Sequence, residues 1–212
     1  MTRDHILHRI RTALGRSAGQ AAPADLPPVR LLVPEVDREA RILSFTARLE
    51  ALGGTVQRAA TTQEACALVA AAIEGKSALA SNAPFLAECG IAALAGVETG
   101  ITDRQRLQER CAAIKVGITS ADYALADTGS LVMLSTAHEA RLVSLLPPEH
   151  IAVVPVERLL TGLDELFTVL PRPAEQTSSM VLITGPSRTA DIEQILVRGA
   201  HGPGQVLAIL VG

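Results

Sequence analysis

Aromatic residues are scarce in this chain of 212 residues. They make up 2% of the sequence, and tryptophan is absent. Side chains that stack on bases are therefore few, and the net charge of −3 disfavours a phosphate backbone, so we expect no binding to nucleic acid. Hydrophobic residues reach 48%, which predicts a core of Ala, Leu, Val and Ile, as in a parallel sheet flanked by helices.

Cysteine is rare, and long apolar runs are missing. Cys66, Cys89 and Cys111 form no C-x-x-C pair, which indicates reduced thiols and excludes the usual iron–sulfur motifs from this chain. No apolar run approaches the roughly 20 residues that span a bilayer, and the first residues lack the apolar stretch of a signal peptide. We expect a cytoplasmic protein that enters no membrane and binds no metal or other cofactor of its own.

The first 28 residues are predicted to be separate from the rest. Apolar residues recur on one helical face of residues 3–14, and residues 15–28 are rich in Ala, Gly and Pro, as in a linker. The helix either packs loosely on its own domain, which we favour, or docks on a partner protein. Residues 29–212 form the predicted main domain.

Extended and helical patterns alternate along this main domain. A helix is predicted from Asp37 to Leu52, ending at the Gly53-Gly54 pair, and another from Thr62 to Glu74. Repeated strand–helix alternation is typical of an α/β domain with a mostly parallel sheet. The predicted strands cover residues 55–58, 77–81, 97–101, 114–118, 130–135, 151–156, 180–184 and 206–211.

Residues 181–203, VLITGPSRTADIEQILVRGAHGP, predict an anion site. A strand enters a turn with Ser187, Arg188 and Thr189, and a helix pattern follows with acidic residues in its first turns. A helix N-terminus offers free N–H groups and a positive dipole end, and Arg188 adds a charge. Ser187 resembles the nucleophile of G-x-S-x-G, but Thr189 stands in place of the last glycine, so a capping or ligand-binding hydroxyl is favoured.

Other polar clusters flank the predicted strand at 130–135. Asp127-Thr128-Gly129-Ser130 precedes it and STAHEAR (135–141) follows it, while His201-Gly202-Pro203 follows the predicted helix. Open α/β sheets bind ligands beyond the carboxyl ends of their strands, so these clusters would form one site if they converged in space. Each also has a purely structural interpretation, as a turn, a solvated helix face or a structural histidine, and HEAR is not the zinc signature H-E-x-x-H.

Three segments resemble the LUD-domain family, specifically the lactate utilization protein C (LutC/YkgG) group: ADYALADTGSLVML (121–134), RLVSLLPPEHIAVV (141–154) and ITGPSRTADIEQILVRGAHGP (183–203). The resemblance implies a fold similar to sugar-phosphate isomerases and CoA transferases. It also implies a role in oxidising L-lactate to pyruvate as one subunit of a three-component system, whose companion proteins carry the iron–sulfur motifs. The family often has Glu before Thr-Gly, where this chain has Asp127.

The leading hypothesis is an accessory subunit of this lactate-oxidising iron–sulfur system that binds a small carboxylate or another anion. Asp127 is the candidate catalytic carboxylate, either orienting substrate hydroxyls or acting as a base if burial raises its pKa. The alternatives are an independent enzyme acting on a phosphorylated or CoA-linked molecule, and a structural partner with a vestigial site. The candidate ligand-binding residues are Ser187, Arg188, Thr189, Gly129, Ser130, Arg141 and His201.

Overall fold

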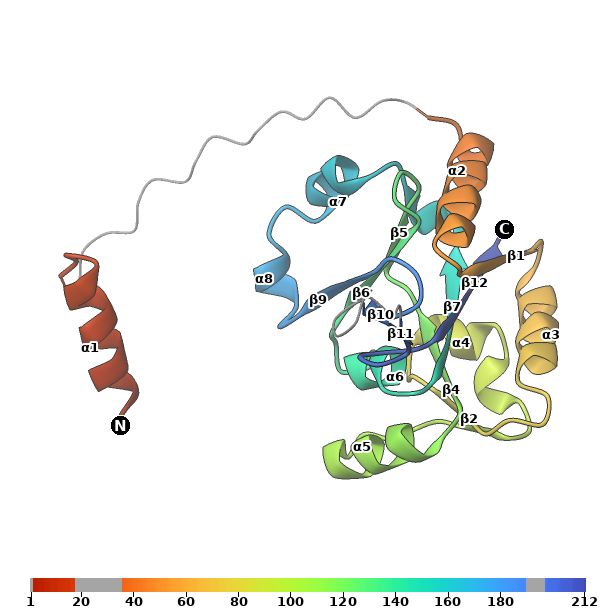
Figure 1. The fold of residues 1–212 in the computed structure, drawn as a ribbon, viewed down its shortest axis with the longest axis horizontal. Helices are drawn as coiled ribbons and strands as arrows, with labels where there is room; N and C mark the ends of the chain where they lie inside the picture. Colours follow the sequence, from red (N-terminus) through yellow and green to blue (C-terminus); the bar gives the residue numbers. More distant parts are fainter. Residues whose placement is uncertain (1, 18–35, 190–196) are drawn as a thin grey trace. The chain divides into compact units, whose positions relative to one another are not determined.

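The computed structural model describes residues 2–17, 36–189 and 197–212 (Figure 1). The chain divides into two compact units, residues 1–30 and 31–212, and each is described by itself. The predicted boundary between residues 28 and 29 lies outside the described residues. Within the described ranges, no helix combines the length and the apolar character needed to cross a membrane.

The first unit contains helix α1 (Arg3–Ala13), which confirms the predicted amphipathic helix. Thr2 caps it, because its Oγ1 accepts a hydrogen bond from the His5 N–H at 3.4 Å. None of its residues is buried, and its apolar face is exposed at Ile6, Ile10 and Leu14.

The second unit is built on a six-stranded sheet in which every neighbouring pair is parallel. This sheet confirms the predicted α/β architecture, and its strands match predicted ones closely. In spatial order they are β1 (Thr55–Ala59), β12 (Gln205–Val211), β7 (Glu149–Pro155), β4 (Val116–Ser120), β2 (Ala78–Ala80) and β3 (Val97–Glu98).

Both faces of the parallel sheet are covered, as the near-continuous apolar strands predict. Along β12, Ile209 faces a cluster with α3 (Thr62–Ala72), α4 (Pro84–Glu88) and the 3₁₀ turn η1 (Ile91–Ala93). Ala208 and Leu210 face α2 (Arg38–Ala51) on the other side.

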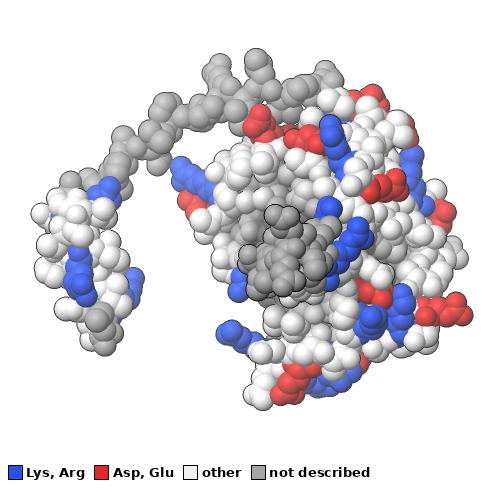
Figure 2. Space-filling view, viewed as in Figure 1, with Lys and Arg blue, Asp and Glu red and all other residues white. Residues whose placement is uncertain are grey.

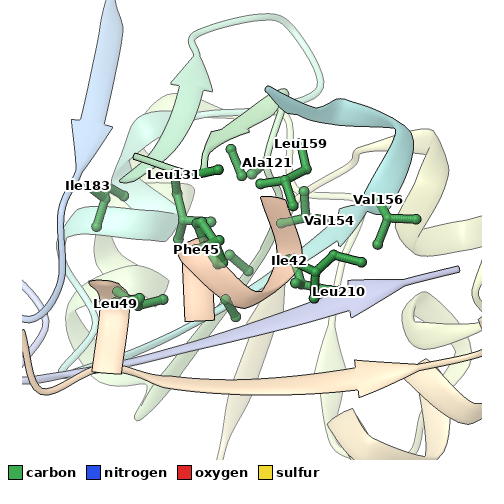
Figure 3. Packing of buried hydrophobic residues seen from close by; sticks show 14 of the residues in the cluster. Ile42, Phe45, Leu49, Ala121, Leu131, Val154, Val156, Leu159, Ile183 and Leu210 are labelled. Carbon is green, nitrogen blue, oxygen red and sulfur yellow. The ribbon is translucent and has the colours of Figure 1, made fainter. Parts of the chain in front are cut away.

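Helix α2 packs through Ile42, Phe45 and Leu49, which recur at helical spacing and are at most 1% exposed (Figure 3). Their cluster includes Leu131 and Leu210, one from each sheet of this unit. The helix therefore joins the two sheets into one core.

The second sheet was not predicted. Its order is β8 (Leu159–Leu160), β5 (Tyr123–Leu125), β6 (Ser130–Leu134) and β9 (Met180–Ile183). β6 pairs antiparallel with both β5 and β9, so the strands predicted at 130–135 and 180–184 do not belong to the parallel sheet. Helix α7 (Leu163–Val169) covers its outer face, with α8 (Pro173–Gln176) following and the 3₁₀ turn η2 (Val156–Arg158) preceding β8.

Two further helices pack on the parallel sheet near β2 and β4. They are α5 (Arg104–Ala113) and α6 (Arg141–Leu145), and their apolar residues cluster with Leu79 of β2. Gly117 of β4 lets α6 approach closely, since a Cβ at this position would overlap the carbonyl oxygen of Val143. This contact holds α6 tightly against β4.

A short hairpin corrects the end of the helix predicted after Thr189. Arg188–Thr189 forms β10 and Val197–Arg198 forms β11, paired antiparallel. Val197–Arg198, at the end of the predicted helix, is therefore a strand, because pairing with β10 overrides the local helix pattern. Residues 190–196, which carry most of the predicted helix, lie outside the described residues.

Candidate functional site

The predicted cluster at Asp127 forms a hairpin turn between β5 and β6. Asp127 is exposed, and its N–H donates to the Thr161 carbonyl oxygen at 3.0 Å. The prediction that Asp127 acts as a base required its carboxylate to be buried, and the structure shows that it is not. Gly129 has φ +67° and lies against the α2 backbone at Leu49, so both its backbone conformation and this close contact require a glycine at this position.

Ser130, at the start of β6, belongs to a small hydroxyl network. Its Oγ donates to Thr128 Oγ1 at 2.8 Å and lies 2.8 Å from Thr184 Oγ1, at the end of β9. These bonds tie the turn to the segment that leads into Ser187. They also satisfy the Ser130 hydroxyl within the fold.

Two further predicted clusters come together at the amino edge of the parallel sheet. We call residues 184–189 and 197–204 the amino-edge loops, because residue 204 donates its N–H to the carbonyl oxygen of Pro148, just before β7. The Ser187 N–H donates to the Pro203 carbonyl oxygen at 2.8 Å, and Ser187 Oγ accepts the His201 N–H at 3.3 Å. The Gly199 N–H donates to the Ser187 carbonyl oxygen at 2.9 Å, so all four of these N–H groups are already used.

Arg188 and Thr189 extend outward along β10. Arg188 is exposed and lies directly opposite Arg198 of β11. Facing like charges weaken a strand pair, and they also concentrate positive charge at one point. His201 and Arg198 line a nearby cavity of about 640 Å³.

Arg141 lies elsewhere, at the carboxyl edge of the sheet. It begins α6 and lines a cleft of about 760 Å³ that also contains Ser81 and Asn82, directly after β2. The predicted convergence of all four clusters is thus not seen among the described residues: two meet at the amino edge, and STAHEAR lies at the opposite end of β6 from Ser130. The position of this cleft, past the carboxyl ends of parallel strands, is the usual one for ligands in open α/β sheets.

The carboxyl-edge cleft carries two cationic side chains. Arg104 begins α5 and Arg141 begins α6, and both are exposed. Neither guanidinium has an ion pair or hydrogen bond with a residue of the described ranges, so both are available to an anion. Polar residues complete the lining: Ser81, Asn82, Thr102, Gln108, Ser135, Thr136, His138, Ser178 and Ser179.

Glu139 lies behind the wall of this cleft and is 5% exposed. Its Oε2 accepts hydrogen bonds from Ser81 Oγ at 2.7 Å and from the Ser120 N–H at 3.3 Å. Burial raises the pKa of Glu139 to about 8, and repulsion from Asp122 adds to the rise against the opposing hydrogen bonds. Near neutral pH the carboxyl group is therefore mainly uncharged.

The loop that carries Glu139 is held by its own hydrogen bonds. Thr136 Oγ1 accepts the N–H groups of His138 at 3.2 Å and Glu139 at 3.0 Å, and the Asn82 N–H donates to the His138 carbonyl oxygen at 2.9 Å. Ser135 is tied to the segment after α8, because its N–H donates to the Ser179 carbonyl oxygen at 2.9 Å. The fold thus fixes the loop against the strand ends.

A model of the LUD domain matches residues 42–211. This chain belongs to the LUD-domain family. The LUD domain therefore covers both sheets, the cleft and the amino-edge loops.

Curated relatives carry one shared name. The LUD domain resembles lactate utilization protein C from Halalkalibacterium halodurans, with 40% identity over 114 residues, which are 52% of this chain and 50% of the relative. It also resembles lactate utilization protein C from Bacillus subtilis, with 41% identity over 100 residues, which are 45% of this chain and 42% of the relative. The matched stretches span half or less of these relatives.

The fold also resembles a crystal structure of a DUF162 family protein from Deinococcus radiodurans. The TM-score is 0.64 at 17% sequence identity, and the match covers 84% of this chain and 100% of that chain. At this identity the likeness supports the fold alone.

The buried histidine and two buried cysteines of the LUD domain are explained by their packing in the fold. His150 is buried, its Nε2 lies 2.8 Å from Thr119 Oγ1, and burial lowers its pKa to about 4. Burial raises the pKa of the Cys89 thiol to about 11 and also raises that of Cys111. No group of three or more His, Cys, Asp or Glu side chains in the described ranges is placed to hold a metal ion.

Sequence reasoning missed Glu139, Ser81 and Arg104. Glu139 lies in STAHEAR, a segment predicted as a polar cluster in which only Arg141 was a candidate ligand-binding residue. Ser81 ends a predicted strand, and the carboxyl-end rule for parallel strands already pointed to it. Arg104 has no comparable signal, because only the packing of α5 brings it to the cleft.

Proposed function

We propose that this LUD domain serves L-lactate utilization by binding a small carboxylate in the carboxyl-edge cleft. Arg104 and Arg141 would hold the carboxylate through charge-assisted hydrogen bonds, with hydroxyl groups of the lining orienting the rest. The single observation that carries this assignment is the pair of guanidinium groups, both without a partner in the described ranges, at the carboxyl edge of the sheet. The shared name of the curated relatives supports the link to lactate.

We further propose that the chain is an accessory subunit and that its partners are iron–sulfur proteins of a lactate-oxidising system in the cytoplasm. The resemblance to the LutC group supports this part. Cys89 and Cys111 are buried with raised thiol pKa values, so thiolate chemistry is disfavoured at both. The resemblance to the LutC group would assign electron transfer to the iron–sulfur partner subunits.

The second candidate is an independent enzyme acting on a phosphorylated or CoA-linked small molecule. One observation favours it: the cleft of about 760 Å³ is far larger than a three-carbon acid and lies within the range of sites for larger ligands. The same two arginines would then bind phosphate oxygens. Turnover of such a compound by the purified chain alone would decide for this candidate.

Growth of a host that lacks only this chain tests the proposed function. We expect loss of growth on L-lactate and normal growth on pyruvate, restored by the wild-type chain. Complementation with Arg141→Ala should fail, whereas the matched Arg188→Ala variant at the amino-edge loops should succeed. Normal growth on lactate without the chain, in a host with no second lactate-oxidising route, would contradict the lactate assignment.

A further inference from the structure

Buried oxygen atoms without partners gather at the inner wall of the carboxyl-edge cleft. Five buried side-chain atoms lack a hydrogen-bond partner in the described ranges, and three of them are Ser120 Oγ, Ser135 Oγ and Glu139 Oε1. Ser135 lines the cleft, Glu139 bonds to the lining residue Ser81, and Ser120 bonds to Glu139. A buried polar atom left unpaired destabilises the fold, so three of them beside one cleft indicate a use beyond folding.

The charges around Glu139 keep this wall suited to an anion. Asp122 follows β4 and repels a second negative charge, while Ser81 and Ser120 present an O–H and an N–H from the ends of β2 and β4. An uncharged carboxyl group can donate a hydrogen bond, and it does not repel a bound carboxylate. The carboxyl group of Glu139 therefore adds no negative charge to the wall of a cleft that also carries the cationic Arg141.

We infer that Ser81 and Ser135, with Glu139 directly behind Ser81, form a subsite for an uncharged oxygen of the ligand, whose carboxylate is held by Arg104 and Arg141. This inference rests on the proposed function and narrows its ligand. It selects acids with a hydroxyl or keto oxygen on the carbon next to the carboxylate. A plain carboxylic acid of the same size leaves the subsite unpaired.

Selectivity between matched acids measures this subsite. One hydrogen bond in a buried site contributes roughly 1–1.5 kcal/mol, so L-lactate and pyruvate should bind about tenfold more tightly than propionate. Propionate has the same carbon chain and the same carboxylate, but it lacks the oxygen on the carbon next to the carboxylate. The comparison therefore isolates the subsite from the arginines.

The experiment is calorimetric titration of the full chain with L-lactate, pyruvate, propionate and inorganic phosphate. Ser135→Ala should reduce the preference for lactate over propionate to about twofold and leave propionate binding unchanged. Ser130→Ala is the matched control, since this buried hydroxyl lies at the other end of β6, and it should keep the full preference. The melting temperature of each variant confirms folding.

A pH series separates Glu139 from the other groups around it. Above the pKa of Glu139, about 8, wild-type affinity for lactate should fall, because the ionised carboxylate repels the ligand and has lost its donor. Glu139→Gln keeps a neutral donor at all pH values and should remove this fall. Asp122, His138 and Arg141 lie near the subsite and are unchanged in Glu139→Gln, so a fall that persists in this variant would belong to them.

Two results overturn the inference, and they are distinguishable. Equal binding of lactate and propionate by the wild type would leave the carboxylate site standing and remove the subsite. Binding of phosphate with no binding of any carboxylate would remove the proposed function and the subsite together. A preference that survives in Ser135→Ala and a pH fall that survives in Glu139→Gln would also assign the selectivity to other residues.

Discussion

Hydroxyl groups have different surroundings at the two ends of β6. At one end, Ser130 is paired with Thr128 and Thr184, and in the amino-edge loops Ser187 is bonded to His201. At the other end, Ser135 Oγ and Glu139 Oε1 are buried without partners in the described ranges. The first group is satisfied by the fold, and the second group is left for a ligand. Whether the fold supplies a hydrogen-bond partner for each buried polar atom therefore distinguishes structural clusters from candidate functional ones. The residue types in the clusters do not make this distinction as well.

The charges differ less clearly between these regions. On the face shown in Figure 2, acidic and basic side chains are interspersed over the described surface. Arg188 and Arg198 at the loops and Arg104 and Arg141 at the cleft are all exposed. Only the second pair lies beside buried unpaired oxygens, so charge alone does not choose between the two sites.

The largest effect is expected where α6 approaches β4. Gly117→Ala would force a Cβ into the carbonyl oxygen of Val143 and should lower the free energy of unfolding by about 3 kcal/mol or more. Denaturant unfolding measures this change. Gly204→Ala is the control at the amino edge, because its nearest contact is 3.6 Å away, and it should cost no more than about 1 kcal/mol. Equal effects would show that α6 does not depend on this close approach.

The next effect is a pH dependence specific to the cleft. Glu139 binds its proton more tightly in the folded chain, with a pKa near 8 against 4.5, so wild-type stability should fall as pH rises through this window. Glu139→Gln should remove the fall, which can reach about 1.4 kcal/mol per pH unit. Thermal unfolding between pH 6.5 and 8 isolates Glu139, because His150, with a lowered pKa, destabilises the fold only as pH drops below 6.5.

The difference between the two ends of β6 is tested directly with Ser130, at the start of this strand, and Ser135, directly after it. Ser130→Ala removes two hydrogen bonds and should cost about 1–2 kcal/mol of stability without changing ligand binding. Ser135→Ala removes a buried hydroxyl without a partner in the described ranges, so it should leave stability unchanged or raise it by up to about 1–3 kcal/mol. Denaturant unfolding of both variants decides, and the opposite order would reverse our assignment of the two ends.

The smallest effect is expected in the β10–β11 hairpin. Arg188→Ala removes one of two facing positive charges and should raise stability by about 0.2–1 kcal/mol at low salt. The gain should shrink as salt is added, which melting curves at two ionic strengths would show. A loss of stability would indicate that Arg188 has a favourable partner.

Much of the fold follows from local patterns. The apolar spacing of Ile42, Phe45 and Leu49 predicts α2, and the near-continuous apolar run of β12 predicts a buried parallel strand. The second sheet does not follow, because β8 has only two residues and the pairing of β6 depends on a hairpin turn at Gly129. The β10–β11 hairpin was not predicted either, because its two short strands are stabilised by pairing with each other and show little strand pattern in the local sequence.

The candidate site was predictable only in part. Arg141 and the segment from Ser135 to Arg141 were recognised as polar residues after a strand, and the structure places them at a cleft. The order and direction of the strands decide which polar clusters lie close together in space. The sequence pattern did not specify this topology. The role of Glu139 depends on burial, and glutamate is rarely buried, so its sequence position gave no reason to single it out.

The position of the ligand is tested most directly by titrating L-lactate into the wild type, Arg141→Ala and Arg188→Ala. Both arginines are exposed, and neither has a partner in the described ranges, so each substitution should leave the fold intact. We predict that Arg141→Ala weakens binding by about 10- to 100-fold, as expected for a lost charge-assisted contact, and that Arg188→Ala binds like the wild type. Normal binding by Arg141→Ala together with loss of binding by Arg188→Ala would contradict the cleft and place the anion at the amino-edge loops.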